Sequence, residues 1–153
     1  DATVSRGELV SVDVGTIHRD YIGDMFRVYT LGEPPGDAVR IHEALDRVNE
    51  KMIAAVKPGA VAADLYELGA GEMRERGCDL VFDFVGHGIG LDVHEPPNLI
   101  PDDTTVLREN MVIVLEVSTR RHDLGHFSAE IPLLVTGSGC ELLTELPYGL
   151  AVV

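Results

Sequence analysis

The chain has 153 residues, which fits one domain, and 45% of them are hydrophobic, enough for a buried core. Its formal net charge is −14, from 26 acidic against 12 basic residues, and such a surface repels phosphate backbones, so a nucleic-acid partner is disfavoured. The sequence has no run of about 18 apolar residues and no apolar leader, so we expect neither a membrane partner nor a signal peptide. Because Cys78 and Cys140 form no metal-type pair, a reduced, cytoplasmic protein is the expectation.

The first elements are expected to form a β-hairpin. Residues Leu9–Asp13 are mostly apolar, as in a buried strand, and Gly15 is expected to begin a turn. Tyr21–Leu31 reads as the second strand, with Tyr21 as a packing aromatic, and the short connection favours a hairpin. The segment Gly32-Glu33-Pro34-Pro35-Gly36 then breaks the pattern.

Two amphipathic helices are predicted next. Apolar residues recur at steps of three and four in the first helix, at Val39 or Ile41, Leu45, Val48, Met52 and Val56. Pro58-Gly59 ends this helix. The second helix runs from about Asp64 to Arg76, with Gly77 as its C-cap. Its inward residues are Leu65, Leu68 and Met73.

The remaining chain is rich in β-type sequence. Strand-like stretches are expected at Leu80–Val85, Met111–Val117 and Glu130–Thr136, and Gly137-Ser138-Gly139 forms a turn after them. Two hairpin-like groups that flank two helices predict an α+β fold with a mainly antiparallel sheet. Residues 1–153 are expected to form one domain.

Five polar residues stand in apolar strand contexts: Asp13, Asp24, His87, Glu116 and Glu130. Each alone has an ordinary explanation, as a turn aspartate, a solvent-facing glutamate or a loop histidine. A buried carboxylate without a partner costs several kcal/mol, and these strands hold very few lysines or arginines. A pair of divalent cations would resolve the conflict, because carboxylates can bridge two metals and imidazole suits Mn, Co, Fe or Zn.

Two motifs carry a resemblance to a known family. Val12-Asp13-Val14-Gly15 is followed by Tyr21-Ile22-Gly23-Asp24, with aspartates 11 residues apart (24 − 13). Gly86-His87-Gly88-Ile89-Gly90 continues through His94 to Pro97, with histidines seven residues apart (94 − 87). From Gly7 onward the chain resembles the pita-bread metallopeptidases. Its sequence around His94 and at Asp24-Met25-Phe26-Arg27 is more similar to the Xaa-Pro dipeptidase and aminopeptidase P branch than to methionine aminopeptidase.

The resemblance implies a pita-bread fold, in which a curved, mainly antiparallel sheet is flanked by helices. It further implies that this chain is the metal-binding catalytic part, lacking part of the N-terminal half. Two divalent metal ions are implied, Mn or Co foremost, with Zn or Fe left open. Their ligands would be Asp13, Asp24, His87, Glu116 and Glu130. Asp24 and Glu130 would bridge both ions, Glu116 would also shuttle a proton, and His94 would hydrogen-bond the substrate.

The implied activity is hydrolysis of the N-terminal peptide bond of short peptides, with proline next to that bond. Ser128 departs from the pattern, because many proline-specific relatives carry an arginine two residues before the last glutamate. Arg27, Arg120 or Arg121 would have to compensate for it. A creatinase-like small-molecule C–N hydrolase and a non-catalytic peptide-binding module remain the alternatives, and a homodimer is left open.

The other histidines receive no role from the resemblance. His18, His42, His122 and His126 are expected in turns or on polar faces, where exposure to solvent is the common state. His126 precedes Glu130 on the same strand, which would bring it near the mouth of the site.

Overall fold

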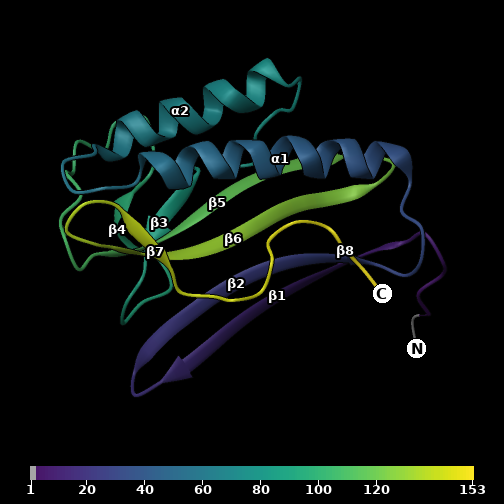
Figure 1. Ribbon diagram of the computed structural model, residues 1–153, viewed down its shortest axis with the longest axis horizontal. Helices are drawn as coiled ribbons and strands as arrows, with labels where there is room; N and C mark the ends of the chain where they lie inside the picture. Colours follow the sequence, from purple (N-terminus) through teal and green to yellow (C-terminus); the bar gives the residue numbers. More distant parts are fainter. Residues whose placement is uncertain (1–2) are drawn as a thin grey trace.

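The fold is a layered α+β arrangement, in which two helices lie over one sheet and a long hairpin lies on the other side of that sheet (Figure 1). The computed structural model describes residues 3–153. Its elements are β1 (Leu9–His18), β2 (Tyr21–Thr30), α1 (Gly36–Ala55), α2 (Ala62–Glu75), β3 (Gly86–Gly88), β4 (Glu95–Asn98), β5 (Val112–Arg121), β6 (Gly125–Val135), β7 (Cys140–Leu142) and β8 (Ala151–Val152).

Strands β1 and β2 form the predicted hairpin, but it is longer than the sequence indicated. The strands pair antiparallel over their whole length, so β1 continues through Gly15, and the prediction of a turn there is wrong. The turn lies at Arg19 and Asp20, whose φ angles of 51° and 71° match the left-handed pair of a two-residue hairpin loop.

The hairpin is also more exposed than predicted. In the described part of the chain β1 is an edge strand, in a sheet of order β1-β2-β8, and most of its side chains face solvent. Tyr21 at the hairpin end is 65% exposed, so its expected role as a packing aromatic is wrong. The apolar residues of β1 therefore reflect the intrinsic propensity of these residue types for strands and not burial, because an edge strand packs on fewer neighbours.

The second sheet has the order β4-β3-β5-β6-β7, with every neighbouring pair antiparallel. Alternation along β5 and β6 divides their side chains between two faces. One face contributes Ile113, Leu115, Val117, Phe127, Ala129, Ile131 and Leu133 to the core beneath the helices. The opposite face, turned toward the hairpin, carries Glu116 and Glu130, so burial of the core face fixes where these acids point.

Helix α1 packs its predicted apolar stripe on this core, and the stripe contains one residue that the sequence interpretation placed elsewhere. His42 is only 3% exposed, so the expectation of a solvent-facing histidine is wrong. It lies four residues after buried Ala38 and three before buried Leu45, on the inward face. Its ring packs edge-on against Phe127, with centroids 5.4 Å apart.

The segment before β3 departs from its predicted strand. Residues Leu80–Val85 make one isolated bridge, between Leu80 and Thr119, and the regular strand is limited to Gly86–Gly88. The backbone here bonds to different partners in turn: Val81 N–H donates to the Ser118 carbonyl, and Val85 N–H donates to the Leu99 carbonyl. Glu116 N–H also donates to the Val85 carbonyl, so the predicted strand became an irregular segment that lies beside residues 116–119 of β5.

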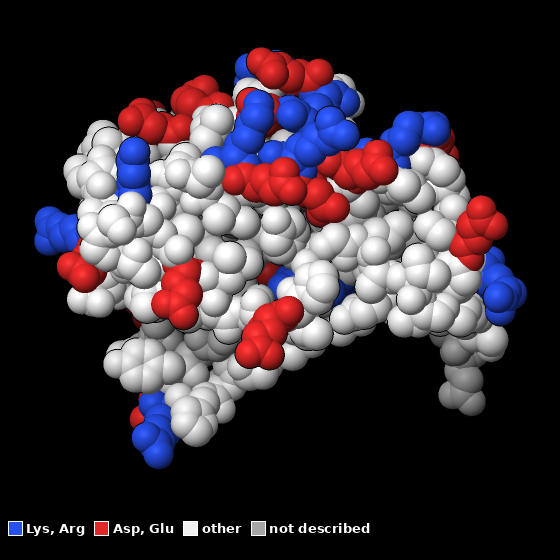
Figure 2. Space-filling view, viewed as in Figure 1, with Lys and Arg blue, Asp and Glu red and all other residues white. Residues whose placement is uncertain are grey.

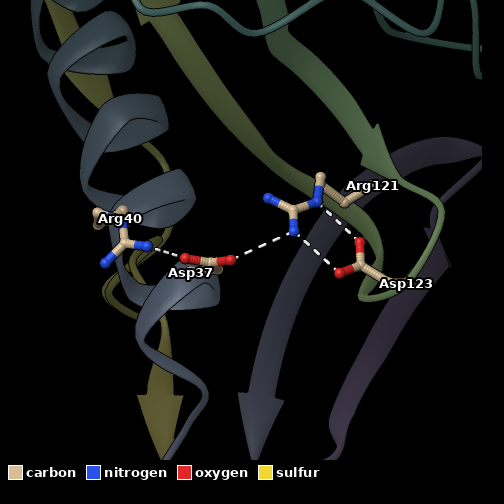
Figure 3. A network of polar contacts seen from close by, with 4 residues as sticks. All are labelled: Asp37, Arg40, Arg121 and Asp123. Atoms are coloured by element: carbon tan, nitrogen blue, oxygen red, sulfur yellow. Dashed lines mark hydrogen bonds and ion pairs between the residues drawn. The ribbon is translucent and has the colours of Figure 1, made fainter.

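Charged side chains are gathered over the helical layer, whereas the part of the surface near β1 and β2 is mostly uncharged in the same view (Figure 2). One network ties the start of α1 to the β5–β6 turn (Figure 3). Arg121 Nη2 lies 3.2 Å from Asp37 Oδ2, and Arg121 Nε lies 2.7 Å from Asp123 Oδ1. Because these groups are exposed and water screens their attraction, the pairs contribute little to stability.

Gly88 provides a test of the close packing around β3. A Cβ atom there would lie 2.6 Å from the Pro96 carbonyl oxygen and 2.7 Å from that of Glu95, so the backbone of β4 would have to move. We expect Gly88→Ala to lower the free energy of unfolding by about 1–3 kcal/mol.

Gly71 in α2 is the matched control, because among residues 3–153 no atom beyond the adjoining helix backbone lies within 4 Å of an added Cβ there. Gly71→Ala should stabilise the protein by about 0.5–1 kcal/mol through helix propensity. Urea unfolding of both variants measures the difference. Equal stabilities would contradict the tight packing inferred for β3.

Candidate metal centre

The hairpin brings Asp13 and Asp24 onto one face. Asp24 is paired with Gly15, two residues from Asp13, so the alternation of the strand directs both carboxylates the same way. Oxygen atoms of Asp13, Asp24 and Glu130 lie within 4.8 Å of one another. The end of the hairpin is tied to the β3–β4 loop, because Ile22 N–H donates to the Gly90 carbonyl at 2.8 Å.

Glu116 and Glu130 are directly opposite each other on β5 and β6. Both residues are buried. Two like charges directly across a strand pair are unfavourable even at a surface, and burial strengthens their repulsion. This pair is therefore not explained as structural reinforcement of the sheet.

His87 completes the group from β3. The flanking glycines place its backbone against β4 and β5, and its side chain is buried. Nδ1 lies 3.0 Å from the Gly88 carbonyl oxygen, which can only accept, so Nδ1 carries the proton. Nε2 is then left with a lone pair, 3.7 Å from Asp24 Oδ2 and 3.7 Å from Glu116 Oε2.

Burial and mutual repulsion make the charged forms of these carboxylates unfavourable, as the pKa values of Glu116 and Glu130 show. Burial, followed by the carboxylates of Asp24 and Asp13, raises the pKa of Glu116 from 4.5 to about 7. Burial, together with the adjoining carboxylate of Asp24, raises the pKa of Glu130 well above its usual range. Burial lowers the pKa of His87, so this imidazole is no counterion for the acids.

Two buried atoms of the group indicate what it could bind. Among residues 3–153, His87 Nε2 and Glu130 Oε2 are buried and have no hydrogen-bond partner. An imidazole lone pair that faces carboxylate oxygens is unfavourable unless a proton or a cation lies between them. The residues present therefore fit divalent metal ions, for which carboxylate oxygen and neutral imidazole are suitable donors. The individual ligand roles of the five residues stay a prediction.

His94 lies beside His87 rather than apart from it. The two imidazole rings stack with centroids 3.8 Å apart and an angle of 15° between their planes. A nitrogen of His94 also lies within 4.8 Å of the donor atoms of Asp24 and His87. His94 is exposed to solvent, unlike His87, and its role toward a substrate stays a prediction.

The sequence interpretation missed the aromatic surroundings of the group. Phe84 packs edge-on against both His87 and His94, with centroids 6.5 Å and 5.9 Å away. His126, which we expected near the mouth of the site, contacts the rings of Phe26 and Phe82. The sequence signal for these neighbours was weak, because Phe82 and Phe84 resemble ordinary alternating strand residues.

Ser128, the departure from the proline-specific pattern, is buried, and its hydroxyl is within 2.7 Å of the Ser118 hydroxyl. Arg27 lies nearest to the last glutamate, but its guanidinium donates to the main-chain carbonyl of Glu130 at 2.6 Å. It also donates to Thr144 Oγ1 and thereby ties β2 to the C-terminal segment. Arg121 is held by Asp37 and Asp123 on the helical side (Figure 3).

The raised pKa of Glu116 gives a pH test of the metal-free protein. Since its folded-state pKa lies above the unfolded value, the unfolded state binds fewer protons between about pH 4.5 and 7. The free energy of unfolding in chelator should therefore fall as pH rises through this window. Glu116→Gln should be more stable than the wild type at pH 8, by about 1–3 kcal/mol, and similar to it at pH 4.5.

The wild type is compared with Glu116→Gln because His42 changes the free energy of unfolding with pH in the opposite direction to Glu116. Burial lowers the pKa of His42 to about 4, so its contribution to stability rises between about pH 4 and its ordinary value of 6.5. His42 is common to both proteins and cancels in their difference, which urea unfolding at several pH values measures. A difference that does not change with pH would contradict the inferred repulsion.

Known proteins resemble this chain both in sequence and in structure. Residues 1–137 match metallopeptidase family M24. An Xaa-Pro dipeptidase of Pyrococcus horikoshii is 34% identical over 146 residues, which is 95% of this chain and 42% of that protein. The chain thus spans less than half the length of this curated relative.

Solved structures agree with this relationship. The X-Pro aminopeptidase of Thermotoga maritima superposes with a TM-score of 0.91 at 30% identity, covering 98% of this chain and 42% of that one. A methionine aminopeptidase of Rickettsia prowazekii has a TM-score of 0.77 at 24% identity over 88% of this chain and 63% of its own, a likeness of fold alone. The predicted α+β, pita-bread architecture is confirmed, and the chain belongs to metallopeptidase family M24.

Proposed function

We propose that this chain supplies the two-metal site of a peptidase that removes the N-terminal residue of short peptides, with Xaa-Pro bonds as the foremost substrates. The observation that carries the proposal is the convergence of four carboxylates and His87, with two buried donor atoms left without partners in the described chain. The names of the relatives, Xaa-Pro dipeptidase and X-Pro aminopeptidase, support the substrate class.

Asp24 and Glu130 are proposed to bridge the two ions, because their oxygens lie with those of Asp13 on one side and Asp24 also faces His87 on the other. Glu116 and His87 would complete the second ion, since they lie 3.7 Å apart. Manganese or cobalt suits this mixture of carboxylates with one imidazole, and zinc or iron can occupy the same donors. When bound, such ions polarise the scissile carbonyl and lower the pKa of an attacking water.

The chain's own groups account for proton transfer and positioning. Glu116 has its pKa raised to about 7, so its carboxyl can take and return a proton near neutral pH. It is the proposed proton carrier to the leaving amine. His94 is exposed and stacked on His87, and it is proposed to donate a hydrogen bond to the oxygen on which charge develops.

Two alternatives use the same site. A small-molecule C–N hydrolase would need the same metal donors, so only a substrate assay separates it from a peptidase. A non-catalytic peptide-binding module would have no need of five convergent donors, and their presence favours catalysis. The structure describes no helix between residues 3 and 153 that is long and apolar enough to cross a membrane.

Variants of the proposed ligands test the two-metal assignment. We expect Asp24→Ala and Glu130→Ala each to lose both ions, because each removes a bridging carboxylate. His94→Ala should keep its metal content and lose about 10²–10³-fold in kcat, the effect of removing one donor to a developing oxyanion. Metal analysis of protein purified without chelator, combined with steady-state kinetics, distinguishes the two classes of variant. Full metal occupancy in Glu130→Ala would rule out the bridging role.

The substrate class is tested by a panel of dipeptides. The intact, metal-loaded protein should hydrolyse Ala-Pro and Leu-Pro faster than Ala-Ala and Leu-Ala, and creatine should not be a substrate. Because Ser128 replaces the arginine of many proline-specific relatives, the ratio of kcat/KM for Ala-Pro over Ala-Ala is the decisive quantity. A ratio near one would remove the proline requirement and leave a broader dipeptidase, whereas hydrolysis of creatine alone would replace the proposal with the C–N hydrolase.

A further inference from the structure

One rim of the metal centre is built from stacked rings. We name Phe26, Phe82, Phe84, His94 and His126 the aromatic wall. The rings of Phe82 and Phe84 stack with centroids 5.1 Å apart and 9° between planes. His126 lies against both Phe26 and Phe82, with centroids 5.4 Å and 6.1 Å away, and Phe84 lies against His94. Each of these contacts has the separation of a favourable ring pair.

The composition of the chain makes this clustering informative. Aromatic residues are only 5% of the sequence, with four phenylalanines among 153 residues. Three of the four belong to the wall, and only Phe127 lies in the core beneath the helices. Among residues 3–153 the fully buried core contains no other phenylalanine or tyrosine side chain, so the phenylalanines are concentrated beside the metal centre.

The wall adjoins the groups proposed to carry out hydrolysis. Phe84 packs edge-on against His87, and His94 stacks on that same imidazole. Phe26 is the strand partner of Asp13, at the other end of the wall. A side chain next to a bond held at the metal centre would therefore lie near Phe84 and His94, the members of the wall that contact His87.

The wall has an accessible apolar surface. Phe82 is 38% exposed, so part of its side chain faces solvent. His126 contributes a partly buried ring, which lies against Phe82. Among residues 3–153 its Nε2 is buried without a hydrogen-bond partner. The surface therefore favours a flat apolar group over a charged one.

We propose that the aromatic wall binds an aromatic side chain of the peptide substrate, and that Phe82 and Phe84 determine this specificity. The proposal rests on the peptidase function proposed above and adds a substrate preference to it. An aromatic ring placed on the exposed side of Phe82 would extend the existing stack, which an alanine side chain cannot do.

Kinetics of a Phe82 variant test the preference. In the intact, metal-loaded protein, Phe82→Leu keeps an apolar side chain and removes the ring. We expect KM for Phe-Pro to rise about 3- to 10-fold, with KM for Ala-Pro changing less than about 2-fold and metal content unchanged. Tyr66→Leu in α2 is the control, because among residues 3–153 its ring makes none of the ring contacts of the wall, so neither KM should change. Equal changes for both peptides in Phe82→Leu would overturn the proposal.

A binding measurement separates failure of the wall from failure of the peptidase function. The chain contains no tryptophan, so Phe82→Trp introduces one indole into it, and its emission reports on the wall. We expect a saturable change with phenylalaninamide and none with alaninamide. This response without hydrolysis of any peptide would refute the peptidase function and retain the wall. Hydrolysis without the response, and without a loss of preference in Phe82→Leu, would refute the wall alone.

Discussion

Mutual repulsion among four carboxylates is the constraint on which the centre of this structure depends. Asp13 and Asp24 come from the hairpin, and Glu116 and Glu130 come from the neighbouring sheet, so the repulsion acts between two separately built parts. His87 does not relieve it, because its protonated Nδ1 is committed to the Gly88 carbonyl and its Nε2 presents a lone pair. A bound cation would attract donors from both parts, and occupancy of the site would then stabilise the native fold through mass action.

The architecture positions these donors through burial on the opposite face of the sheet. The aliphatic residues of β5 and β6 must face α1 and α2, and strand alternation then turns Glu116 and Glu130 toward the hairpin. A shift of one residue in register would place the acids in the core, at a cost of several kcal/mol for each buried charge. Packing of the core thus specifies the orientation of the acids, even though the helices lie on the other side of the sheet.

The elements that could be predicted from sequence are those whose periodicity reflects one dominant environment. Helix α1 and the pair β5–β6 each have one face on the core, and their type was predicted correctly, although β5 extends to Arg121 and β6 begins at Gly125, beyond the predicted strands. Prediction from the apolar pattern failed where strand propensity does not coincide with a buried face or a regular ladder. β1 has a strand sequence without a buried face, and the segment from Leu80 to Val85 bonds to changing partners instead of one ladder. His42 was wrongly expected to face solvent because histidine is a polar residue type, although its position belongs to the apolar stripe of α1.

The site shows the same division. Its convergent polar side chains could be singled out from the sequence, because each is a charged or imidazole group in an apolar strand context, where isolated polar residues require an explanation. The surrounding rings gave no such signal, since phenylalanine in a strand is the common case and its partners come from three distant segments. Donors of this kind define which chemistry a site can perform. Selection among substrates depends on apolar neighbours like Phe82, whose arrangement is decided by tertiary packing and is visible only in the fold.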